Sequence, residues 1–455
     1  MRRCIGPVAL VVLVVAIAVA GSIAAPSEAR EASPSGIKPP PRECDQTPVA
    51  FDRPLHLGAG FEPSVDVDSE GVIFVTAPAA SGTNELWRSA DGGKTFQPIS
   101  AVNEPAQGLL GLEGDIALDG EDRLYYADTW LVDNHLYRFS DHGETLDFAR
   151  PALPTLWTDD RPWLAAHHDG FVYLLTNAYP KPGGNDVIHR STDGGLTFDP
   201  VGFTMPHSDL SFIAADPHSD HVYAVTIDTG TTDPAESQDT VYVYVSDDRG
   251  ASWTGKKVAR LRFGWPGARR DDGLGYAWPS IAVSPDDGTI SALWGDGLRR
   301  LKLARSRDHG ATWKIYDVTP FEGEFGHPWV AAGPTGDVGV IFAADPRSVV
   351  GGDNFLYGMI WRDRSRCRET GAGTSRCRGP ASNYARLTQQ GFPDSVSQDD
   401  FFQVAFLADN ALVVPFHGSS EASALGPAGP QIFFTRQVAG PNLWRRTSCG
   451  VIGRP

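Results

Sequence analysis

One eight-residue pattern recurs along the chain and constrains its fold more than any other feature. Its form is Ser-x-Asp-x-Gly-x-Thr/Ser-aromatic, and four copies match it closely while a fifth is worn. The copies occupy residues 89–96, 139–146 (the worn copy), 191–198, 246–253 and 306–313. Their aspartates are 50, 52, 55 and 60 residues apart, and they are Asp91, Asp141, Asp193, Asp248 and Asp308. A period of this size predicts a repeat architecture.

The residue types in the pattern are those of a tight turn. An Asp side chain accepts hydrogen bonds from backbone N–H groups that follow it. The Gly two positions later supplies a positive φ, and the Thr or Ser hydroxyl closes the turn on its other side. The final aromatic residue begins a strand and buries a large apolar surface. Each copy therefore predicts a turn between antiparallel strands, with a structural role for its aspartate.

A longer unit surrounds these turns. An apolar strand, a Gly or Asp turn and a second apolar strand occur at residues 63–75, 162–174 and 279–291, and two further units at 328–341 and 402–414 lack the pattern. The units begin near Glu62, Glu113, Arg161, Asp209, Trp278, His327 and Asp399. Seven units of three or four short strands predict an all-β fold, a β-propeller with seven four-stranded antiparallel blades. Six blades are the alternative, if one unit is shared or split.

The pattern resembles the Asp-box, or BNR, repeat of the sialidase-like β-propellers. The resemblance covers nearly the whole mature chain and implies that the Asp-boxes lie on the outer rim, away from the funnel where ligands bind. The segments 160–163 and 399–402 are similar to those of uncharacterised secreted bacterial sialidase-like proteins. Active sialidases carry an arginine in a Phe/Tyr-Arg-Ile-Pro motif, whereas this chain has Glu62 there. Because an acid would repel the substrate carboxylate, the catalytic motif is not matched.

The residues that precede each expected inner strand are the candidates for a site, because innermost strands line the central channel of a propeller. Five of the seven positions carry an acid, which suits polyhydroxylated ligands or a hard cation. The alternative is that these acids cap blade entrances by accepting backbone hydrogen bonds. The candidate catalytic carboxylates are Glu113, Asp160 and Asp209. The candidate ligand-binding residues are Arg161, Tyr276, Trp278, His327, Asp399 and Asp400.

Three functions are open from the sequence. The favoured one is a binding module for a carbohydrate or protein ligand at the funnel, because the rim is acidic and the expected arginine is missing. The second is an exo-acting, sialidase-like glycoside hydrolase that uses rim carboxylates. It would place two carboxyl groups roughly 5–5.5 Å apart if retaining or about 6.5–9.5 Å apart if inverting. The third is an extracytoplasmic scaffold, which predicts a broad exposed apolar patch.

The N-terminus predicts secretion. Arg2 and Arg3 precede a continuous apolar run at residues 8–20, which is typical of a secretory signal. We therefore expect residues 1–29 to be a signal peptide, 30–47 a flexible leader and 48–455 a single propeller. An uncleaved membrane anchor is the alternative.

Cysteine usage and charge complete the expectations. Four cysteines remain after the signal, and an even number in an oxidising compartment predicts disulfides Cys44–Cys449 and Cys367–Cys377, with free thiols as the alternative. The net charge of −17 argues against nucleic acid and anionic membranes as partners. We expect a secreted monomer without a cofactor, with structural calcium left open. No zinc site is expected, because there is no Cys-x-x-Cys or spaced His pair.

Overall fold

The structure is a computed structural model that describes most of the region expected to form the propeller. The described residues are 48–78, 84–99, 111–130, 133–153, 158–179, 186–206, 208, 210–228, 240–261, 279–297, 299–333, 336–346, 355–362, 383–388, 402–417 and 431–440. The expected signal peptide and leader lie outside them, as do all four cysteines of the predicted disulfides. No helix in the described part of the chain is long and apolar enough to cross a membrane.

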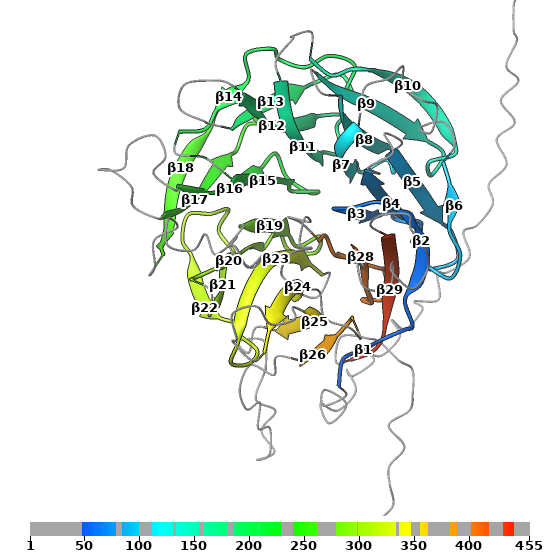
Figure 1. Cartoon of the computed structure of the whole chain (residues 1–455). Coiled ribbons are helices and arrows are strands. Elements are labelled where there is room, and N and C mark those ends of the chain that lie inside the picture. The colour runs from blue at the N-terminus through cyan, green and yellow to red at the C-terminus, as the bar shows by residue number, and fades with distance from the viewer. Residues whose placement is uncertain are drawn as a thin grey trace, which may run out of the picture. The chain divides into compact units, whose positions relative to one another are not determined.

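The described residues form seven antiparallel sheets, the blades of a β-propeller (Figure 1). This confirms the predicted seven blades and rules out six. Blades 1 to 3 are β3 (Ser64–Val67), β4 (Ile73–Pro78), β5 (Asn84–Ser89), β6 (Gln97–Pro98); β7 (Gly111–Leu118), β8 (Leu124–Trp130), β9 (Asp133–Ser140), β10 (Thr145–Pro151); and β11 (Thr158–Ala166), β12 (Val172–Tyr179), β13 (Val187–Ser191), β14 (Phe203–Thr204).

The next three blades repeat the same order of strands. They are β15 (Leu210–Ala215), β16 (Val222–Asp228), β17 (Thr240–Ser246), β18 (Thr254–Arg260); β19 (Ser280–Val283), β20 (Ile290–Gly295), β21 (Leu301–Ser306), β22 (Lys314–Asp317); and β23 (Glu324–Ala332), β24 (Asp337–Asp345), β25 (Phe355–Arg362), β26 (Asn383–Arg386). The first strand of each blade contacts the first strand of the next, so these strands surround the central axis of the propeller (Figure 1).

Blade 7 closes the ring with strands from both parts of the chain. It contains β27 (Ala405–Phe406), β28 (Leu412–His417) and β29 (Gln431–Ala439), and both β1 (Ala50–Phe51) and β2 (Leu55–Ala59) pair with β29. Ala50 lies opposite Ala439, and Leu55 lies opposite Phe434. The backbone ladder between these segments therefore joins the beginning and the end of the propeller.

The core lies between the blades, because both faces of a blade pack against its neighbours. Strand β16 is buried at all seven positions and β24 at all nine. Such strands read as continuous apolar runs rather than alternating ones. Trp294, Tyr173 and Phe342 are among the largest side chains that are fully covered.

The repeated Asp turns have one hydrogen-bond geometry in four copies. In blade 3, Asp193 Oδ1 accepts hydrogen bonds from Ser191 Oγ at 2.8 Å and from Thr197 N at 2.8 Å, and Oδ2 accepts one from Thr197 Oγ1 at 2.6 Å. Gly195 has a φ of 82°, and a Cβ there would lie 2.6 Å from Leu136 of blade 2. The glycine therefore provides both the turn and the close packing of neighbouring blades.

The worn copy in blade 2 departs from this geometry. Asp141 and His142 both have positive φ, and Asp141 still accepts the hydroxyl of Thr145 at 2.8 Å. Ser140 Oγ donates to Asp147 Oδ1 at 2.7 Å instead of to the turn aspartate. Phe139 stands where the other copies have the serine that donates to the turn aspartate, which accounts for the difference.

Arginines on third strands link one blade to the turn of the next. Each guanidinium donates to a backbone carbonyl oxygen in the neighbouring turn. The pairs are Arg88–His142 at 2.6 Å, Arg138–Gly194 at 3.0 Å, Arg190–Arg249 at 3.2 Å and Arg436–Gly92 at 3.0 Å. The last pair extends the series across the closure of the ring.

Candidate functional site

The two ends of the channel differ in their connections. Because strands alternate in direction, the links between first and second strands and between third and fourth strands share one side, which we call the turn face. The links between second and third strands and from blade to blade share the other side, the connection face. On the turn face β15 ends at Ala215 and β16 begins at Val222, whereas on the connection face β18 ends at Arg260 and β19 begins at Ser280. Apart from the link between β25 and β26, the long links lie on the connection face, where binding sites tend to occur.

Four of the predicted site residues lie in first strands, near the connection face. Glu113 lies in β7, and Asp160 and Arg161 lie in β11, but their side chains are not among those described. The remaining candidates outside the described residues are Asp209, Tyr276, Trp278, Asp399 and Asp400. Their proposed roles stay predictions.

His327 is the predicted ligand-binding residue whose side chain the structure describes. It lies in β23 with a φ of 47° and is only 4% exposed. Its ring is perpendicular to that of Phe402 at a centroid distance of 6.3 Å. His327 thus packs between blades 6 and 7, and a ligand would reach it only after neighbouring side chains moved.

Two carboxyl groups lie between neighbouring first strands, and that of Asp66 is at the turn-face end of these strands. Asp66 on β3 accepts hydrogen bonds from Val67 N at 2.8 Å and from Leu118 N of β7 at 2.9 Å. Asp115 on β7 accepts one from Leu164 N of β11 at 2.8 Å. The first strand of each blade has a free edge, and its N–H groups need acceptors. Both aspartates supply such acceptors to the next blade.

Gln403 connects this pair to blade 7. Its Nε2 donates to Asp115 Oδ1 at 2.9 Å, while its Oε1 accepts from Val65 N at 3.1 Å. One amide therefore bridges the first strands of blades 1 and 2 across the closure. Gln403 thereby fixes the Asp115 carboxyl group relative to β3, the strand that carries Asp66.

Burial changes the acidity of the two carboxyl groups. It raises the pKa of Asp66 to about 7, despite hydrogen bonds from Val67 and Leu118, and the nearby charge of Asp115 raises it further. Burial likewise raises the pKa of Asp115 to about 6, against the hydrogen bonds from Leu164 and Gln403. Asp66 is partly exposed whereas Asp115 is 3% exposed. Asp66 is therefore the member of the pair that a ligand can contact.

Further acids are buried toward the connection face. They lie where second strands end or where first and third strands begin, which are the strand ends nearest the connection face. Each is at most 6% exposed. They are Glu62, Asp128, Asp186, Asp228, Asp296, Glu324 and Asp345. Arg299 lies 3.8 Å from Glu324. Burial, with the charge of Asp128 as a second cause, raises the pKa of Tyr137 to about 12. This face is thus acidic beneath its connections.

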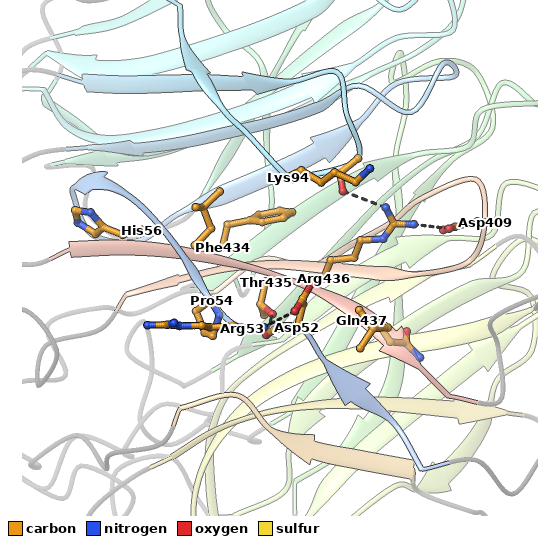
Figure 2. A pocket seen from close by; sticks show the side chains of 14 residues that line it. Asp52, Arg53, Pro54, His56, Lys94, Asp409, Phe434, Thr435, Arg436 and Gln437 are labelled. Carbon is orange, nitrogen blue, oxygen red and sulfur yellow. Dashed lines mark hydrogen bonds and ion pairs between the residues drawn. The ribbon is translucent and has the colours of Figure 1, made fainter.

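A separate pocket of about 780 Å³ lies at the outer side of the closure, between β2, β29 and the first Asp turn (Figure 2). Arg436 extends across it and donates to Gly92 O and to the carboxylate of Asp409. His56 Nε2 lies 2.7 Å from Gln431 Oε1. These side chains hold the closing strands together, and the pocket is distant from the first strands that surround the channel.

Asp66 and Asp115 were not among the predicted site residues. The predicted acids precede the inner strands, whereas these two lie within strands. A usable signal was present, because an acid occupies the interior of an otherwise apolar first strand in two consecutive units. A polar side chain at such a position needs a partner.

No family model and no curated protein match the chain. Among solved structures, it is similar to a protein of unknown function from Dyadobacter fermentans (14% identity, TM-score 0.43, 86% of this chain and 97% of that chain). It is also similar to an α-L-arabinofuranosidase from Fusarium graminearum (15%, 0.44, 70% and 98%) and to an intramolecular trans-sialidase from Ruminococcus gnavus (14%, 0.41, 87% and 95%). Likeness this distant carries no argument about activity, and the strand topology establishes the fold.

Proposed function

We propose that this chain is a secreted Asp-box propeller that binds a neutral glycan at its channel, with Asp66 as the contacting carboxyl group. The observation that carries the proposal is the Asp66–Asp115 pair, held by Gln403 and by backbone N–H groups of neighbouring first strands. A carboxyl group that titrates near neutral pH can donate as well as accept hydrogen bonds, which suits sugar hydroxyls.

The charge of the protein supports a neutral ligand over an acidic one. The net charge is −17, and Asp115 and Asp68 place negative charge near Asp66. Anionic sugars would meet like charge there, whereas neutral polyhydroxylated chains would not. In this proposal Asp115 is a positioning residue, because it is buried and acts through Gln403 and the charge it places near Asp66.

Glycoside hydrolysis is the second candidate, and the same pair favours it. Two carboxyl groups with different, raised pKa values are what an acid and its partner need at neutral pH. Hydrolysis would use Asp66 as the proton donor to the glycosidic oxygen.

A glycan array probed with the mature protein tests the proposal. We expect binding to neutral glycans that is lost in Asp66→Asn and kept in Asp91→Asn, the same substitution on the turn face. Equal binding by Asp66→Asn and the wild type would contradict the proposal. Loss only in Glu113→Gln with Asp160→Asn would place the site at the rim instead.

A panel of fluorogenic glycosides, with a sialoside included, separates the two candidates. Turnover that disappears in Asp66→Asn would make the protein a glycosidase. Binding without turnover would leave it a binding module.

A further inference from the structure

A histidine-rich cluster lies on the turn face, where His168 packs against Gly120 of blade 2. His167, His168 and Asp169 form the turn between β11 and β12 of blade 3. One ligand atom from each, a ring nitrogen or a carboxylate oxygen, lies within 4.8 Å of the other two. The two imidazole rings have a centroid distance of 4.0 Å.

His167 has a buried nitrogen to which no other described residue is hydrogen-bonded. The residue is 0% exposed, and its Nε2 lies 2.5 Å from the carbonyl oxygen of Ser219 in blade 4. A carbonyl accepts only, so Nε2 carries the proton and Nδ1 holds the lone pair. Nδ1 is buried and has no hydrogen-bond partner among the described residues, so its lone pair is available to a metal ion.

The two neighbouring residues complete a set of donors. His168 Nε2 lies 3.2 Å from Asp169 Oδ1, close to the separation of about 3.3 Å expected between two ligands of a tetrahedral zinc ion. Nδ1 of His168 is also buried and has no hydrogen-bond partner in the described part of the chain. The other oxygen of Asp169 pairs with Arg249 at 2.9 Å, and Arg249 pairs with Asp220 at 2.8 Å. Such outer contacts orient a ligand toward its metal.

We propose that His167 through Nδ1, His168 through a ring nitrogen and Asp169 through Oδ1 bind a divalent transition-metal ion of the zinc class. Two imidazoles and a carboxylate suit zinc, whereas calcium and magnesium prefer oxygen ligands throughout. Solvent would supply the fourth ligand. The sequence predicts no zinc site by the spacing of cysteine pairs or separated histidines. Two adjacent histidines do not match either spacing.

A second cluster nearby is less suited to one ion. It contains Asp216, His221 and His309. The two imidazoles are stacked with an interplanar angle of 12° at 4.0 Å, so an ion in the plane of one ring is out of the plane of the other. Nδ1 of His221 faces Ser219 Oγ, and Nδ1 of His309 faces Tyr223 OH. This cluster serves as the matched control.

Calorimetric titration of the purified mature protein with Zn²⁺ tests the proposal. We expect one ion per chain. We expect a loss of affinity of more than about ten-fold in Asp169→Asn and in His168→Gln with Asp169→Asn, and no change in His309→Gln. Replacing zinc with cobalt should give a visible spectrum of tetrahedral coordination that is absent in the double variant. His167 is left intact because it is buried, and thermal unfolding checks that every variant is folded.

Several results would overturn this site. They are the absence of zinc binding, equal affinity in the wild type and the double variant, or a loss in His309→Gln as large as that in Asp169→Asn. Calcium that competes with zinc at equal concentration would overturn the assigned metal class.

Discussion

The turn face and the connection face are built from the same strands but are specified in different ways. On the turn face, short turns carry their own hydrogen bonds, and arginines and histidines join neighbouring blades. Toward the connection face, acids are buried beneath long links that share no pattern. The difference shows that the repeated turns specify the scaffold, while most links of the connection face vary in length without changing it.

The largest expected effect tests whether packing on the turn-face side sustains the closure. Phe434 is 1% exposed, and its ring is 4.7 Å from that of Phe96 across blades 7 and 1. Phe434→Ala should reduce the free energy of unfolding by about 3–5 kcal/mol because it leaves a cavity at this junction. Urea denaturation measures the change, with Val201→Ala at a 75% exposed position as control. A loss below about 1 kcal/mol would show that the closure does not depend on this packing.

The second prediction concerns Asp66, whose folded-state pKa of about 7 is above its ordinary value of 3.8. The folded state then binds more protons than the unfolded state between these values, so stability falls as pH rises from about 4 to 7. Asp66→Asn should remove this dependence. The wild type should lose about 1–2 kcal/mol more than the variant between pH 5 and pH 8, since solvent reaches Asp66 and screens part of the shift. If the stability of the wild type and of Asp66→Asn changed equally with pH, the raised pKa could not be that of Asp66.

Turn-face aspartates should show the opposite pH dependence. Hydrogen bonds from Thr95, first its hydroxyl and then its N–H, lower the pKa of Asp91 to about 2. Its contribution is present above pH 4 and is lost as pH falls toward 2. Asp91→Ala should cost about 1 kcal/mol at pH 7, because the group is exposed and water replaces part of its bonding. Thermal unfolding from pH 2 to 5 checks this. If the wild type and Asp91→Ala lost stability equally as pH falls toward 2, the contrast with Asp66 would be wrong.

The smallest effect is expected for a long link on the connection face. Asp228 and Thr240 lie opposite each other in β16 and β17, so a loop of about 2–5 residues can join these strands. Replacing residues 229–239 with four residues of Gly and Ser should change stability by less than about 1 kcal/mol. Urea denaturation provides the measurement. A loss above about 2 kcal/mol would mean that this link stabilises the scaffold.

Much of the scaffold could be predicted because its information is local. The Asp turns and strand spacing predict seven blades and their starting points, and first strands such as β3 at Ser64 and β19 at Ser280 begin within two residues of the expected starts. The closure through β1 and β2 could not be predicted, because it pairs short segments almost 400 residues distant in sequence from β29. Asp66 and Asp115 could not be predicted, because their hydrogen-bond partners Leu118 and Leu164 belong to the next blade. A local sequence pattern does not contain those contacts.

The most direct measurement is the affinity of the strongest neutral glycan at pH 5 and pH 8, for the wild type and Asp66→Asn. A neutral ligand that covers Asp66 removes water from it, which disfavours the charged form. The account therefore predicts tighter binding at pH 5 than at pH 8 in the wild type and no pH dependence in the variant. The same pH dependence in both proteins would show that the ligand does not contact Asp66.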